Sequence, residues 1–182
     1  SEYTIEVLKK CKTRGIKVMA ATARPERTIK EYDATIGFDA VTVMNGAKVM
    51  VGDKVLTYGI PDKLAEEMLA KVCGRKEFLF SVETGEILYA TEHIPEFEYT
   101  LHTGFPKLPI GETIYKILVS GEGAAEFVKE NLPEGLHCTV ANGYLVQIMS
   151  NDANKRNGVQ VMLNAFGIAP EEAVYFGDDY DD

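Results

Sequence analysis

Apolar positions along the chain follow two different patterns. Residues 4–14 place them at helical spacing, whereas residues 16–21 and 40–44 are short, continuous apolar runs of strand length. Such runs are typical of parallel strands that are buried on both faces, and a second helix, ending near Ile36, separates them. This alternation of helix and buried strand predicts right-handed crossovers in a doubly wound, parallel α/β sheet.

The pattern changes in the middle of the chain to short segments that turn back at glycine. Gly52-Asp53 and Thr84-Gly85 both mark tight hairpins, and two helical segments are interspersed among the hairpins. Hairpins with interspersed helices are typical of an α+β module. We therefore expect residues 53–146 to form an inserted domain, and residues 1–52 and 147–182 to form the core into which it is inserted.

The parallel pattern returns near the C-terminus. Residues 155–166 form an amphipathic pattern that predicts a helix, and Gly167 follows it. Residues 173–176 are a further apolar run, which predicts a third buried parallel strand. Because open sheets of this type usually have about five strands, we expect further strands to complete the core at both ends.

Polar groups follow the predicted parallel strands, at the edge where open sheets of this type bind ligands. Thr22 follows the first strand, where its hydroxyl can contact an anion beside the next helix or can cap that helix. Asn45-Gly46 follows the second strand and is a turn signal as well as a candidate contact. Lys155 begins the last core helix, where a cation gains nothing from the helix dipole, which makes it a candidate site residue. A solvated lysine is the simplest interpretation of this residue taken alone.

Four carboxylates stand directly behind the third predicted strand: Asp178, Asp179, Asp181 and Asp182. Like charges this close raise one another's pKa unless a cation or hydrogen-bond donors hold them. A solvated acidic tail is one interpretation, but the apolar run and the glycine before the cluster favour a site. Hard oxygen ligands of this kind suit Mg²⁺.

Composition narrows the classes of function. The 182-residue chain has a net charge of −9 and no basic stripe, which disfavours nucleic-acid binding. No apolar stretch approaches the roughly 18 residues that a membrane span needs. The three cysteines lack CxxC spacing, which favours free thiols in a reducing compartment and predicts a cytoplasmic location. An acidic protein that binds phosphate must neutralise it locally, with a metal ion, a lysine or helix N-termini.

Four segments in order, "VMAATARP", "MNGAKVM", "NKRNGVQVMLNAFGI" and "VYFGDDYDD", resemble the haloacid dehalogenase (HAD) superfamily and, within it, the Cof-type phosphatases. The resemblance implies a Rossmann-like core with an inserted α+β cap domain at about residues 53–146. It also implies an Mg²⁺-dependent phosphatase that acts on small phosphorylated metabolites, sugar phosphates among them, through an aspartyl-phosphate intermediate.

The same resemblance assigns roles to individual residues. Thr22 would hydrogen-bond a phosphate oxygen, and Lys155 would neutralise the transferring phosphoryl group. Asp178 would bind Mg²⁺ directly, and Asp182, behind the metal, would orient metal-bound water or Lys155. Asp181 stands where the family usually has Asn, and a carboxylate cannot donate to phosphate unless it is protonated, so this phosphate contact departs from the pattern. Asp179 is expected to be solvated.

The first motif of the family, DxDxT, is absent because the sequence begins just after the position where that motif should end. That motif supplies the nucleophilic aspartate. A sugar phosphomutase is an alternative, and so is a non-catalytic phosphometabolite-binding protein if the protein truly lacks the motif. The sequence identifies neither the substrate nor the oligomeric state.

Overall fold

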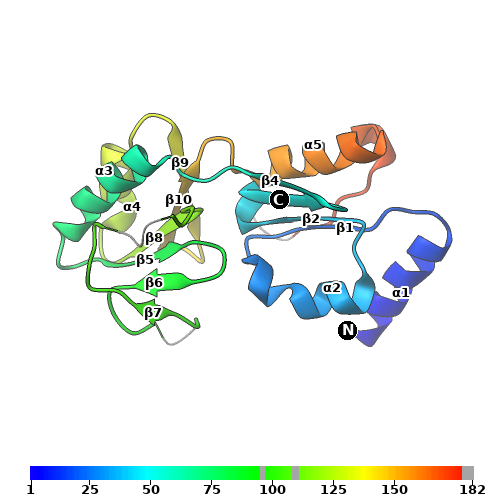
Figure 1. Ribbon diagram of the computed structural model, residues 1–182, viewed down its shortest axis with the longest axis horizontal. Helices are drawn as coiled ribbons and strands as arrows, with labels where there is room; N and C mark the ends of the chain where they lie inside the picture. Colours follow the sequence, from blue (N-terminus) through cyan, green and yellow to red (C-terminus); the bar gives the residue numbers. More distant parts are fainter. Residues whose placement is uncertain (95–96, 108–110, 178–182) are drawn as a thin grey trace. The chain divides into compact units, whose positions relative to one another are not determined.

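The computed structural model describes residues 1–94, 97–107 and 111–177 and divides into two compact units, each with its own sheet (Figure 1). The first unit comprises Ser1–Tyr58 and Asp152–Asp182, and the second comprises Gly59–Asn151.

A four-stranded mixed sheet in the order β1-β2-β3-β4 forms the centre of the first unit. Strand β1 (Met19–Ala21) is parallel to β2 (Ala40–Val43), and the hairpin of β3 (Lys48–Val51) and β4 (Lys54–Thr57) continues the sheet in antiparallel fashion. All four residues of β2 are buried, as its continuous apolar run predicts.

Helices lie on both sides of this sheet. Figure 1 shows α5 (Lys155–Phe166) on one side of the strands, and α1 (Glu2–Thr13) and α2 (Lys30–Ile36) on the other. The close approach of α5 to β2 requires a glycine, since a Cβ atom at Gly158 would lie 2.4 Å from Thr42 Oγ1. The predicted helix that ends near Ile36 is split, because a separate 3₁₀ turn, η1 (Glu26–Thr28), precedes α2.

Asp39 joins the segments at the opposite end of β1 and β2 from the predicted ligand edge. It accepts hydrogen bonds from Val18 N at 2.9 Å, from Lys12 Nζ at 3.0 Å and from Lys17 Nζ at 3.1 Å. Burial alone would raise the pKa of Asp39, but these hydrogen bonds outweigh it, so the pKa lies below its ordinary value. One carboxylate therefore connects α1, β1 and the start of β2.

The second unit contains a six-stranded sheet in the order β7-β6-β5-β8-β10-β9, in which only β6 and β7 are parallel. Its strands are β5 (Leu79–Glu83), β6 (Leu88–Ala90), β7 (Thr100–Leu101), β8 (Lys116–Ser120), β9 (Leu136–Ala141) and β10 (Leu145–Ser150). Its helices are α3 (Asp62–Cys73) and α4 (Ala124–Asn131). Both helices pack on the same face of the sheet, where they bury a single hydrophobic core.

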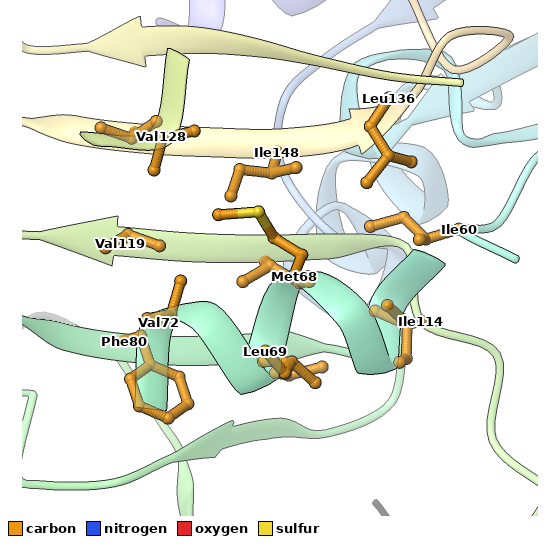
Figure 2. Packing of buried hydrophobic residues seen from close by; sticks show 14 of the residues in the cluster. Ile60, Met68, Leu69, Val72, Phe80, Ile114, Val119, Val128, Leu136 and Ile148 are labelled. Carbon is orange, nitrogen blue, oxygen red and sulfur yellow. The ribbon is translucent and has the colours of Figure 1, made fainter. Parts of the chain in front are cut away.

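Figure 2 shows how α3 contributes to this core. Met68 and Val72 are fully buried and lie against strand residues that include Val119 and Ile148. Because side chains alternate along a strand, the neighbours of these core residues point to the other face of the sheet. We call that second face, which neither α3 nor α4 covers, the helix-free face.

Three predictions about the fold need correction. The boundaries at residues 52/53 and 146/147 are displaced, since β4 pairs with β3 in the first unit and all of β10 pairs with β8 and β9 in the second. The predicted strand at 173–176 is wrong, because these residues form no strand and Val174 and Phe176 are 79% and 90% exposed. A strand needs a neighbour for its backbone groups, and no described strand pairs with this segment.

Candidate active site

Thr22 lies directly after β1, and hydrogen bonds fix its backbone and its side chain. Its N–H donates to Thr42 O at 3.0 Å, its carbonyl accepts from Asn45 N at 3.0 Å, and Oγ1 accepts from Arg24 N at 3.2 Å. Thr22 does not cap a helix, because Pro25 precedes η1 and Ile29 precedes α2. No described residue accepts the hydroxyl proton of Thr22, so this proton is available to an anion.

The chain turns sharply at the end of β2. Met44, Asn45 and Gly46 have φ angles of 51°, 55° and 95°, all in the left-handed region. This region is unfavourable for a residue such as Met44, and backbone strain of this kind often occurs at functional sites. Met44 N donates to Arg24 O at 2.9 Å, so the turn is bound to the loop that follows β1. The turn predicted at Asn45-Gly46 is confirmed.

Lys155 occupies the first position of α5, directly after the N-cap residue Asn154, whose Oδ1 accepts from Asn157 N at 2.8 Å. The solvated-lysine interpretation is wrong, since Lys155 is only 7% exposed. A cation at a helix N-terminus is unfavourable for the helix, because the positive end of the helix dipole is near. Its position therefore calls for a reason other than helix stability.

A backbone contact connects Lys155 to the turn after β2. A Cβ atom at Gly46 would lie 2.0 Å from the carbonyl oxygen of Asn154, so only glycine allows this approach. Since Asn45 in turn binds Thr22, the backbones around Thr22, Gly46 and Lys155 meet at the carboxyl end of β1 and β2. This is the edge at which an open α/β sheet binds ligands.

Arg24 is a further cation at this edge that the sequence analysis gave no role. Its N–H binds the Thr22 hydroxyl and its carbonyl binds Met44 N, while the residue as a whole is exposed. An arginine three residues after the predicted strand at residues 16–21 was the signal that could have identified it. Its guanidinium group is suited to bidentate contacts with phosphate.

The four predicted carboxylates, Asp178, Asp179, Asp181 and Asp182, lie outside the described residues. Within the described ranges, no group of three or more His, Cys, Asp or Glu side chains could hold a metal ion. The chemistry of the predicted donor set fits Mg²⁺, because this ion takes carboxylate oxygens and completes its octahedron with water and substrate phosphate. The metal site stays a prediction from the sequence.

Comparison with known proteins identifies the family. The model of the haloacid dehalogenase-like hydrolases matches residues 1–182, so the chain belongs to this family of hydrolases, as predicted from its motifs. No helix in the part of the chain that the structure describes is long and apolar enough to cross a membrane.

Individual relatives are distant. A protein of Buchnera aphidicola subsp. Baizongia pistaciae, named as a candidate phosphatase, is 24% identical over 100% of this chain and 74% of its own length. A chloroplastic endoribonuclease YBEY of Arabidopsis thaliana is 26% identical, and this chain spans 36% of its length. The solved structure of the sugar phosphatase BT4131, of HAD subclass IIB, superposes with a TM-score of 0.72 at 19% identity, over 94% of this chain and 71% of that one. The structural likeness confirms the doubly wound α/β fold of the family.

Proposed function

We propose that the protein is an Mg²⁺-dependent phosphatase that hydrolyses small phosphorylated metabolites, sugar phosphates among them. The observation that carries this proposal is the meeting of Thr22, the turn at 44–46 and the buried Lys155 at the carboxyl end of β1 and β2. Membership of a hydrolase family supports it, as do the names of the Buchnera relative and of the sugar phosphatase with a similar fold.

Three side chains of the described site would bind the phosphate group. The Thr22 hydroxyl would donate to one phosphate oxygen, and the Lys155 ammonium would neutralise negative charge on the transferring phosphoryl group. The exposed guanidinium of Arg24 would contact a further phosphate oxygen. Hydrogen bonds within the first unit fix the backbone around Thr22, Arg24 and the start of α5, which supports this assignment.

The acidic motif would complete the site. Asp178 would hold Mg²⁺, Asp182 would orient Lys155 or a water molecule on the metal, and Asp181 would lie at the phosphate in place of the usual Asn. A bound Mg²⁺ would supply neutralisation of charge on the phosphoryl oxygens. The nucleophile would be the aspartate of the first motif, which would form an aspartyl phosphate as the alcohol leaves, and water would then hydrolyse that acyl phosphate to release inorganic phosphate.

The second unit, Gly59–Asn151, is proposed to be the cap domain of Cof-type members. Three free cysteines support a reducing, cytoplasmic setting for the protein. The substrate is proposed to be a small phosphorylated molecule.

Replacement of Lys155 tests the proposal. In the complete protein, Lys155→Met keeps most of the buried side-chain volume but removes the charge, and kcat for p-nitrophenyl phosphate should fall on the order of 10²-fold or more. The matched control is Lys9→Met, on the exposed side of α1, which should leave kcat unchanged. Near wild-type turnover in Lys155→Met would remove this lysine from the site. Unfolding curves of both variants separate loss of chemistry from loss of fold.

A further inference from the structure

The described residues include an ion pair at the carboxyl end of β2 that the proposed function does not use. Lys48 begins β3 opposite Val43, the last residue of β2, so its backbone lies at the edge where the loop after β1 and the turn at 44–46 meet. Its Nζ lies 2.5 Å from Oε2 of Glu26, the first residue of η1. The pair therefore connects the start of β3 with the loop that carries Thr22 and Arg24.

A carboxylate at this position is unfavourable for the binding of an anion. Glu26 is the only acidic residue between Thr22 and Lys30, and it stands two residues after Arg24, which is proposed to contact phosphate. The Glu26 side chain is only 25% exposed, so water screens its charge in part. Because like charges repel, this carboxylate would oppose a phosphate group at the same edge unless a cation lies beside it. Lys48 supplies such a cation.

Stability of the fold does not explain the pair. Backbone hydrogen bonds already hold the loop, since Met44 N donates to Arg24 O at 2.9 Å and Ile29 N donates to Glu26 O at 3.0 Å. Ion pairs that water reaches contribute little to stability, because ordering two long side chains offsets the attraction between them. The Lys48 side chain is 22% exposed. What the pair adds at this edge is therefore a balance of charge rather than a support for the backbone.

The two partners of the pair differ in what their loss would do to a bound anion. Without the Lys48 charge, the Glu26 carboxylate would remain unneutralised at the carboxyl end of β1 and β2 and would repel phosphate. Without the Glu26 charge, the Lys48 ammonium would add to the attraction for phosphate. A pair that only braced the loop would instead respond in the same way to the loss of either partner. This asymmetry separates an electrostatic role from a structural one.

We propose that Lys48 neutralises the Glu26 carboxylate and thereby allows a phosphate group to bind at the carboxyl end of β1 and β2. Lys48 acts through Glu26 and does not touch the reacting atoms, so it affects substrate binding, measured by KM, more than the chemical step. The inference rests on the proposed phosphatase function and adds to it the charge balance that the site needs.

Steady-state hydrolysis of p-nitrophenyl phosphate by the complete protein with Mg²⁺ tests the inference. Lys48→Met should raise KM about three- to tenfold, the scale of one charge interaction near a protein surface, and should change kcat by less than about twofold. Glu26→Gln should not raise KM, and the double variant Lys48→Met/Glu26→Gln should return KM to within about twofold of wild type. Lys54→Met is the matched control, because it removes the same charge from the exposed, opposite end of the β3–β4 hairpin, and it should leave KM unchanged.

An equal rise of KM in Lys48→Met and Glu26→Gln would overturn the inference, because it is the response of a structural brace, and so would an unchanged KM in a folded Lys48→Met protein. Salt gives a second readout, since about 1 M NaCl should reduce the ratio of KM between Lys48→Met and wild type, and a ratio that is independent of salt would contradict an electrostatic role. If Lys48→Met does not fold, Glu26→Gln still decides, because a raised KM in that variant is incompatible with the inference. A wild-type protein that hydrolyses no phosphomonoester would overturn the proposed function itself, whereas wild-type turnover without the expected asymmetry overturns this inference alone.

Discussion

The contact between Gly46 and Asn154 offers a sharp test of how the candidate active site is built. Gly46→Ala introduces a methyl group at a position with φ of 95°, where it would lie 2.0 Å from Asn154 O and 2.4 Å from Asn154 C. The atoms in the way belong to the backbone, so a change of rotamer cannot relieve the clash. Gly52→Ala is a matched control, because Gly52 also has a positive φ, of 55°, but no atom lies within 4 Å of a Cβ there.

The two variants differ in one of two costs. Both place alanine in the left-handed region, which costs roughly 1–2 kcal/mol. Gly46→Ala adds overpacking, which typically costs about 1–3 kcal/mol when the surroundings must move. We therefore expect Gly52→Ala to lower the free energy of unfolding by roughly 1–2 kcal/mol and Gly46→Ala by roughly 2–5 kcal/mol. Since relief of the clash moves Asn154, and Lys155 with it, kcat should fall in Gly46→Ala alone.

Urea unfolding and steady-state hydrolysis of p-nitrophenyl phosphate by the complete protein measure both effects. Activity is compared at a temperature where both variants are fully folded. Equal destabilisation in the two variants would refute the close backbone approach. Normal kcat in a clearly destabilised Gly46→Ala protein would refute the argument that this approach positions Lys155.

Three further outcomes follow from single residues. Asp39→Asn should lower the free energy of unfolding at pH 7 by roughly 1–3 kcal/mol, the scale for hydrogen bonds to a charged group. Because the pKa of Asp39 is lowered in the folded state, the loss of stability in Asp39→Asn should be fully present above the ordinary pKa of 3.8. It should disappear as the pH falls through the folded-state pKa. A stability difference between variant and wild type that stays constant in urea unfolding down to pH 2 would contradict this. Asp181→Asn should lower KM for a phosphomonoester, because a donor replaces a repulsive carboxylate, whereas an unchanged or higher KM would place Asp181 away from the phosphate. Met68→Ala removes a fully buried side chain from the core of the second unit and should lower the free energy of unfolding in urea by about 2–5 kcal/mol. A change near zero would mean that α3 is not packed as Figure 2 shows.

Elements with strong local signals were predicted closely from the sequence. The structure places α5 at Lys155–Phe166, the same bounds as the predicted helix. The hairpin of β5 and β6 also lies where Thr84-Gly85 indicated a turn. In each case the hydrophobic period and the capping or turn residue indicate the same element. Tertiary contacts therefore stabilise the structure that the local sequence already favours.

Features that depend on distant partners could not be predicted. The run at 173–176 has the composition of a strand, yet pairing depends on a neighbouring strand rather than on its own residues. β4 was assigned to the inserted module because hairpins predominate there, but its register with β3 places it in the first unit. Asp39 also gave no signal, since its three donors come from segments up to 27 residues away.

The structure shows three locally unfavourable features at the candidate site, which lies at the edge of the sheet that the sequence predicted. Met44 adopts a left-handed conformation, Lys155 is buried at the positive end of a helix, and the turn at Gly46 leaves no room for a side chain. Each feature alone has a structural explanation, such as a tight turn or a lysine stem packed against apolar neighbours. All three occur, however, at the same edge of the sheet, beside a threonine whose hydroxyl proton has no acceptor in the described residues. Local costs that collect in one place are expected where function, rather than stability, determines the structure. This coincidence favours an anion site at the carboxyl end of β1 and β2 over three independent structural explanations.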